Sequence, residues 1–257
     1  MAGDGGPPQG QQSSRQATRR AAAAQGAREA FGVPAIVLGA SFLGFGALVR
    51  EAGLSPWHGL LSTVLGWALP GQVAMVELYA AGASLVAILA AVALTNARLL
   101  PMTVSLMPLL RAPGLGRSAL YLAAHFVAVT GWAAAMRQAP RLPAPARLPY
   151  FLGFVVVIWA SSLAATAGGY HLAGAVPAEV TLGLVFINPI YFMLVFAADA
   201  RRRARVLALV LGAVAGPSLY LVATDWSLLL TGLLAGSLAF FGDRWWRRKQ
   251  SVGGGDG

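Results

Sequence analysis

Long apolar runs separated by short arginine-rich segments dominate this sequence between residues 31 and 242. Of the 257 residues, 57% are hydrophobic and 11% are charged, whereas a soluble domain carries about 25% charged residues. A chain with so few charges cannot cover a water-facing surface. The runs therefore predict an all-α polytopic membrane protein, because a helix satisfies its own backbone hydrogen bonds in lipid.

Eight apolar runs are long enough, or nearly so, for a spanning helix, which needs at least roughly 17 residues. They are Gly32–Val49, Trp57–Ala81, Ser84–Leu110, Ser118–Met136, Tyr150–Ala167, Ala178–Ala198, Val206–Val222 and Ser227–Phe241. We therefore expect about eight transmembrane helices. The last run is the shortest, and the sequence alone leaves open whether it is a full span.

The basic residues give this topology a direction. If the N-terminus is inside, eight spans place 15 Arg and Lys residues on the inner side and leave only Arg50, Arg111 and Arg117 outside, with Arg98 within a span. This asymmetry agrees with the positive-inside rule. It also accounts for the net charge of +10 without a nucleic-acid partner. A six-span alternative stays open, in which two of the weaker runs are re-entrant.

The two ends of the chain differ from the apolar runs in composition. Residues 1–30 are rich in Gly, Gln, Ser, Ala and Arg and hold no apolar signal-peptide segment. We expect them to form a disordered basic cytoplasmic tail. Residues 31–242 are then the transmembrane permease domain, and residues 243–257 are a flexible cytoplasmic tail.

Four prolines fall within the predicted spans: Pro70, Pro101, Pro189 and Pro217. Proline lacks a backbone donor and clashes with the preceding turn, so each of these helices should be kinked or unwound. The prolines form two similarly spaced pairs, which hints at two related halves made of runs one to four and five to eight. A binding site would then lie between runs two, three, six and seven.

Polar side chains near these breaks are candidates for substrate binding. They are Gly71 and Gln72 after Pro70, Asn96 and Arg98 in the third run, and Asn188 before Pro189. A central Arg costs roughly 2.5–3.5 kcal/mol on the insertion scale, so such residues usually line a pathway. The structural alternatives are that Gln72 caps a broken helix and that the Arg98 side chain extends to the membrane interface.

Glu77 and His125 are candidates for proton coupling, because both can gain or lose a proton within the membrane. The alternatives are that Glu77 lies at the interface or pairs with Arg98, and that His125 is a packed, hydrogen-bonded side chain. The chain has no cysteine and three scattered histidines. We therefore expect no metal and no cofactor.

Short motifs follow one another in a characteristic order. They are Gly44-Phe45-Gly46-Ala47, Ala52-Gly53-Leu54-Ser55-Pro56-Trp57, Ser62, Gly71-Gln72, Ala81-Gly82-Ala83, Asn96-Ala97-Arg98 and Gly183-Leu184-Val185-Phe186 with Pro189 and Phe192. This order resembles the AzlC family of branched-chain amino acid exporters, over roughly residues 31 to 242.

The resemblance implies a permease of the bacterial inner membrane that works with a small AzlD-type partner subunit. It would export leucine, isoleucine and valine, sometimes methionine, driven by the proton gradient, with Gln72, Asn96 and Arg98 as its core motif. Two positions depart from the family pattern: Leu99 replaces a frequent basic or aromatic residue, and His125-Phe126 replaces a frequent acidic pair. These departures leave the coupling ion and the exact substrate open.

Other functional classes make different demands on the sequence. A membrane enzyme would need a nucleophile with a base or a carboxylate pair, and we find no Gly-x-Ser-x-Gly motif and no Asp or His pair. An enzyme is therefore not expected. A structural or assembly subunit without a pathway of its own, and a channel, remain the rivals to a transporter.

Overall fold

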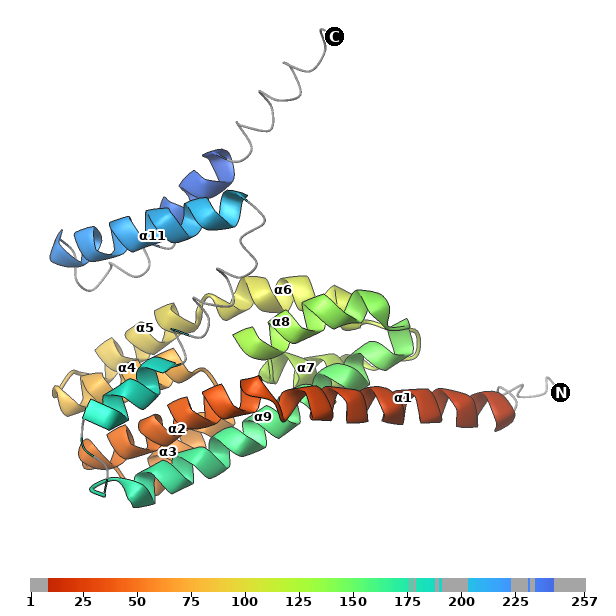
Figure 1. Ribbon diagram of the computed structural model, residues 1–257, viewed down its shortest axis with the longest axis horizontal. Helices are drawn as coiled ribbons and strands as arrows, with labels where there is room; N and C mark the ends of the chain where they lie inside the picture. Colours follow the sequence, from red (N-terminus) through yellow and green to blue (C-terminus); the bar gives the residue numbers. More distant parts are fainter. Residues whose placement is uncertain are drawn as a thin grey trace, which may run out of the picture. The chain divides into compact units, whose positions relative to one another are not determined.

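The computed structural model describes residues 9–175, 177, 179–187, 190, 203–222, 231 and 234–242. These residues form helices joined by turns, with no β-strand among them (Figure 1). The chain consists of two compact units, Met1–Asn188 and Pro189–Gly257. The helices of the first unit include α1 (Gln9–Ala30), α2 (Val33–Glu51), α3 (Pro56–Leu65), α4 (Leu69–Ala80), α5 (Leu85–Asn96), α6 (Leu99–Leu110), α7 (Arg117–His125), α8 (Val129–Gln138), the 3-10 turn η1 (Ala139–Arg141) and α9 (Ala144–Leu172). The second unit contains α11 (Arg203–Val222).

Among the described residues, α2 and α9 are long and apolar enough to cross a membrane. Helices α5 and α6, which are bent by 44° at Ala97 and Arg98, form a third candidate span. With 29 residues at about 1.5 Å each, α9 is about 43 Å long and exceeds a bilayer core of about 30 Å. Its two ends, called here the Ala144 end and the Leu172 end, define the direction of the other helices.

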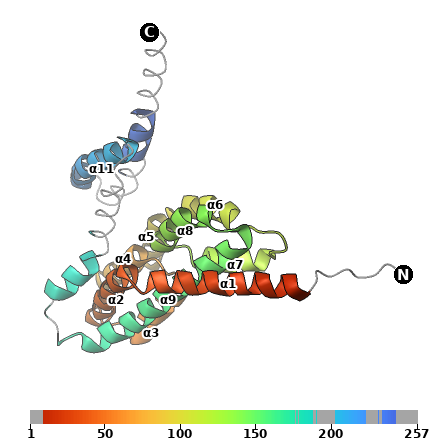
Figure 2. The same cartoon turned by 45° about the vertical axis from the view of Figure 1, so that its right-hand side comes forward.

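Helices α1 and α2 follow one another along α9 in the same direction (Figure 2). Near the Ala144 end, Gly26 of α1 lies against the backbone of Tyr150; further along, Gly46 of α2 lies against the backbone of Thr166. A Cβ atom at either glycine would collide with that backbone, so these contacts need small residues. Residues 9–30 were expected to be disordered. They form a helix instead, because this small-residue face packs closely on α9.

Helix α3 starts at the Leu172 end of α9. Just before it, Arg50 donates hydrogen bonds to the Tyr170 and His171 carbonyls at 3.2 and 3.3 Å. Halfway along α9, the Trp159 ring nitrogen donates to the Thr63 carbonyl of α3 at 3.3 Å. The helix ends at Leu65, so α3 reaches only the middle of α9.

Helix α4 then returns toward the Leu172 end. Its first turn lies beside the last turn of α5, where Gly71 contacts the Asn96 side chain. Helices α4 and α5 are therefore antiparallel. Because α5 and α6 together run to the Ala144 end, where Arg147 donates to the Leu109 carbonyl at 3.3 Å, α4 must end at the opposite end (Figure 1).

Helices α7 and α8 form a second hairpin, which enters from the Ala144 end. Its tip lies at the middle of α9, where the Phe126 ring packs edge-on against Trp159 with centroids 5.6 Å apart. On the way back, Gly131 lies against Val155. At the end of α8, Gln138 bonds to Glu29 of α1 at 3.4 Å.

These hairpins correct the predicted course of two apolar runs. Trp57–Ala81 and Ser118–Met136 were each expected to be one span, but each is two short helices that reverse direction halfway. The physical cause is a short non-helical segment in each run, residues 66–68 and 126–128. Both segments end in an alanine with extended backbone, Ala68 and Ala128.

The predicted proline breaks lie differently from expectation. Pro70 is in the first turn of α4, directly after the break at residues 66–68. Pro101 is in the first turn of α6, where the N–H that proline lacks has no intrahelical partner; the chain is interrupted earlier, at Ala97 and Arg98. Pro217 does not interrupt its run, because α11 continues through it, and the Ser218 hydroxyl adds a bond to the Val214 carbonyl.

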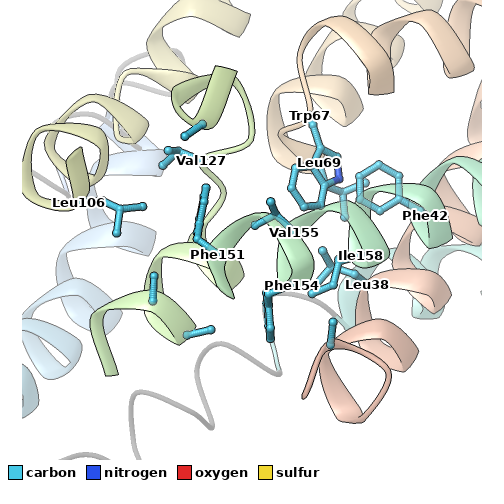
Figure 3. Close-up of a cluster of buried hydrophobic side chains, with 14 of the residues drawn as sticks. Leu38, Phe42, Trp67, Leu69, Leu106, Val127, Phe151, Phe154, Val155 and Ile158 are labelled. Carbon is cyan, nitrogen blue, oxygen red and sulfur yellow. The ribbon is translucent and has the colours of Figure 1, made fainter. Parts of the chain in front are cut away.

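One apolar cluster joins the long helices to both hairpins (Figure 3). Phe154 and Ile158 of α9 are buried in it, together with Phe42 of α2. Trp67 enters it from the break between α3 and α4, and Val127 from the break between α7 and α8. The cluster therefore fixes the two hairpin tips against the middle of α9.

Candidate functional site

Three interruptions of helical structure meet at the middle of α9. They are the tip of the α3–α4 hairpin, the tip of the α7–α8 hairpin and the bend between α5 and α6. Direct contacts join them: Val64 of α3 accepts a hydrogen bond from His125 of α7 at 2.9 Å, and Gly71 of α4 packs on Asn96 of α5. We call this region, residues 62–72, 96–98 and 125–128 with Trp159 and Ser162, the central site.

The last carbonyls of α3 are satisfied by side chains from other helices. The His125 ring donates to the Val64 carbonyl, and the Trp159 ring donates to the Thr63 carbonyl. Since a carbonyl can only accept, the Nε2 atom of His125 carries a proton in this contact. Broken helices are tolerated at membrane depth only when such groups are paired or line a cavity. These two bonds therefore stabilise the interruption after α3.

Gln72 is the most buried polar side chain of the predicted site, with 4% of its surface exposed. Its amide nitrogen donates to the hydroxyls of Ser62 and Thr63, both at 2.9 Å. Each hydroxyl gives its own proton to the Gly59 carbonyl and can only accept from Gln72. This arrangement fixes the orientation of the amide group and leaves Gln72 Oε1 buried without a partner.

Asn96 carries a second buried acceptor without a partner, its Oδ1 atom. Its carboxamide lies on the face of Gly71, where a methyl group would come within 2.5 Å of Oδ1 and 2.7 Å of Nδ2. Gly71 thus provides the space for Asn96. Two unpaired acceptors therefore lie at the first turn of α4, one on Gln72 and one on the Asn96 side chain that packs on Gly71.

Arg98 lies at the bend between α5 and α6, is exposed, and precedes the first residue of α6. Glu77 is exposed on α4. Within the part of the chain that the structure describes, no ion pair joins these two residues, and neither side chain has a hydrogen-bond partner. The structure therefore brings Gly71, Gln72, Asn96 and His125 into the central site, with Arg98 at its edge. Glu77 is left outside it.

The helix ends give this region its electrostatic character. Helices α4, α6 and α8 all begin here, and the N-terminal end of a helix carries a partial positive charge. In α4, Pro70 has no N–H, so Leu69 and Gly71 are the first-turn donors without an intrahelical partner. The central site thus offers N–H donors and a positive dipole end beside the two free amide oxygens.

Asn188 and Pro189, the residues predicted to contribute to the site from the sixth run, lie outside the described residues.

Sequence reasoning missed Thr63 and Trp159, although a Ser-Thr pair one turn before a break is a signal for such a network. It also missed Glu29, which accepts hydrogen bonds from Gln25, Gln138 and Tyr150. Among the described residues, no group of three or more His, Asp or Glu side chains is suited to hold a metal.

Apolar helices that are long enough to cross a bilayer, together with interrupted helices that meet beside the middle of α9, suggest a transport-related α-helical membrane protein. Residues 34–176 match the family model described as AzlC protein. The match covers more than half of the chain, so this protein belongs to the AzlC family. No curated protein and no solved structure matched the chain. The family is generally linked to branched-chain amino acid transport.

Proposed function

We propose that this protein is the large subunit of a secondary transporter that exports branched-chain amino acids, leucine, isoleucine and valine, across the bacterial inner membrane. Methionine is a further substrate of similar size and polarity. A small AzlD-type membrane protein is its partner. Family membership supports the substrate class, and the central site supports a role in binding rather than in structure alone.

The observation that carries the proposal is the pair of buried, unpaired amide oxygens on Gln72 and Asn96. A buried polar atom without a partner costs about 1–3 kcal/mol. A purely structural role would not offset that cost, whereas a polar substrate that donates hydrogen bonds to both oxygens would. Arg98, exposed at the adjacent bend, is available for the carboxylate of such a substrate.

The proposal includes a membrane topology with six spans rather than eight. The spans are α2, the bent pair α5–α6, α9 and the last three apolar runs; the hairpins α3–α4 and α7–α8 enter from opposite sides without crossing. Arg111 and Arg117 then move to the inner side. In this topology 17 of the 19 basic residues lie inside, Arg98 lies within a span, and only Arg50 lies outside. Six spans therefore satisfy the positive-inside rule better than eight spans do. Both termini remain cytoplasmic.

The arrangement of the hairpins suggests how access could alternate. A span followed by a hairpin occurs twice with opposite direction, as α2 with α3–α4 and as α5–α6 with α7–α8. Inverted repeats of this kind, with half-helices that meet near the bilayer midplane, are typical of secondary transporters. Proton coupling belongs to the proposal, with His125 at the contact between the two tips as the titratable group that the geometry favours and Glu77, outside the central site, as its alternative.

Counterflow of labelled leucine into proteoliposomes tests the proposal. Vesicles that hold this chain together with its small partner should accumulate labelled leucine when preloaded with unlabelled leucine, and Arg98→Gln should abolish the accumulation. A channel would equilibrate leucine without counterflow. Vesicles in which wild-type and Arg98→Gln proteins both give no flux would support an assembly subunit without a pathway.

A further inference from the structure

The two free acceptors of the central site indicate which end of a substrate it recognises. Gln72 Oε1 and Asn96 Oδ1 can only accept hydrogen bonds. Because both oxygen atoms are buried, water reaches them less readily than it reaches a surface group, and a ligand that donates hydrogen bonds is favoured. Among the groups of an amino acid, the ammonium group carries three donors, and the carboxylate carries none.

Gln72 is held by two hydroxyls near the end of α3, which contact its amide nitrogen. The hydroxyls of Ser62 and Thr63 both donate to the Gly59 carbonyl. They therefore accept from the amide nitrogen of Gln72. The oxygen then points away from α3 with no partner. Four residues of the hairpin thus cooperate to present one acceptor, and Gly71 serves the second by leaving room for the Asn96 carboxamide.

The same turn of α4 opposes a simple cation. Its N-terminal dipole end is positive, and the free N–H groups of Leu69 and Gly71 favour an anion. A ligand with an ammonium group and a carboxylate on the same carbon atom satisfies both halves of this turn. A ligand with only one of them leaves the other half unpaired.

We propose that the first turn of α4 is an ammonium-recognition site for zwitterionic amino acids, with Gln72 Oε1 and Asn96 Oδ1 as its acceptors. This inference rests on the proposed function and makes it specific. The transporter selects for the α-amino group itself, and it rejects the keto acid with the same aliphatic side chain. The aliphatic part of the substrate contributes affinity without this discrimination.

Binding to the full-length chain in lipid nanodiscs tests the inference. Labelled leucine is displaced by unlabelled leucine, by 2-hydroxy-4-methylpentanoate, which has one donor in place of the amine, and by 4-methyl-2-oxopentanoate, which has none. Wild-type protein should prefer leucine over the keto acid by about tenfold or more, with the hydroxy acid between them. Equal affinity for leucine and the keto acid would overturn the inference.

Two variants and one control assign the discrimination to these residues. Gln72→Met and Asn96→Leu remove one acceptor each and should reduce the preference for leucine over the keto acid, whatever their effect on overall affinity. Thr103→Val is the control, because the Thr103 hydroxyl bonds only to the Leu99 carbonyl of its own helix. If both variants keep the wild-type preference, the acceptors lie elsewhere. If wild-type protein gives neither leucine binding nor leucine counterflow, the proposed function fails as well.

Discussion

The two hairpins have the same design and opposite chemistry. In both, the second arm begins after an extended alanine, Ala68 or Ala128, and has glycine as its third residue, Gly71 or Gly131. These positions are separated by 60 residues in each case. Yet Gly71 accommodates the Asn96 carboxamide, whereas Gly131 accommodates the apolar side chain of Val155.

The residue after each glycine continues the contrast. Gln72 is buried, fixed by two hydroxyls and left with a free acceptor. Trp132 donates its single ring proton to the Ser105 hydroxyl at 3.0 Å and has no acceptor to offer. The same backbone arrangement therefore serves binding in the α3–α4 hairpin and packing in the α7–α8 hairpin. The difference between the two roles lies in the side chains.

Substitution of the two fourth-position residues should separate these roles most strongly. Gln72→Leu removes a buried acceptor and should lower leucine affinity about 10- to 100-fold, as expected for hydrogen bonds to a charged group. Trp132→Phe keeps the ring and should change affinity by less than about threefold. Nanodisc binding measures both, with gel-filtration profiles as the folding control. Similar losses in both variants would contradict the division of roles.

The two glycines should differ in which property they affect. Gly131→Ala would bring a methyl group within 2.5 Å of the Val155 side chain in the core, so the free energy of unfolding should fall by about 1–3 kcal/mol. Gly71→Ala displaces the Asn96 carboxamide and should weaken leucine binding more than it lowers stability. Thermal unfolding in detergent and leucine binding distinguish the two. A Gly71→Ala protein that binds leucine normally would argue against a role for Asn96.

The hydrogen bond between His125 and the Val64 carbonyl should contribute both to stability and to proton coupling. His125→Phe leaves the Val64 carbonyl unpaired and should lower the free energy of unfolding by about 1 kcal/mol. It also removes a titratable ring, so a pH gradient should no longer drive uptake into inverted vesicles, while counterflow continues. Gradient-driven uptake that persists in this variant would exclude His125 from proton coupling.

Glu77→Gln should have the smallest effect. The carboxylate is exposed and has no partner in the described part of the chain, and substitutions of this kind change stability by about 0.5 kcal/mol or less. Leucine counterflow and its dependence on the pH gradient should change by less than about twofold. A large loss of gradient-driven transport would show that Glu77, rather than His125, is the coupling group.

The sequence was sufficient for the all-helical class with apolar spans and for the family. It also singled out Gln72, Asn96 and Arg98, because charges and amides inside apolar runs are costly and conspicuous, and their role in binding stays a prediction. It was not sufficient for the hairpins. Hydropathy is the same whether Trp57–Ala81 crosses the bilayer or turns back within it. Only long-range contacts, such as the bond from Arg147 to Leu109, reveal the reversal. The helix at residues 9–30 was missed because its packing depends on small residues, which also occur in disordered segments.

Labelling of single cysteines tests most directly whether the hairpins enter from opposite sides, because the native chain has no cysteine. Ala81→Cys lies in the turn that precedes α5, and Arg117→Cys is at the first residue of α7. Ala52→Cys and Arg141→Cys are the references for the outer and inner sides. The two-hairpin account predicts that a membrane-impermeant maleimide added to intact cells labels Ala81→Cys but not Arg117→Cys. Labelling of Arg117→Cys and protection of Ala81→Cys would contradict it and restore eight full spans.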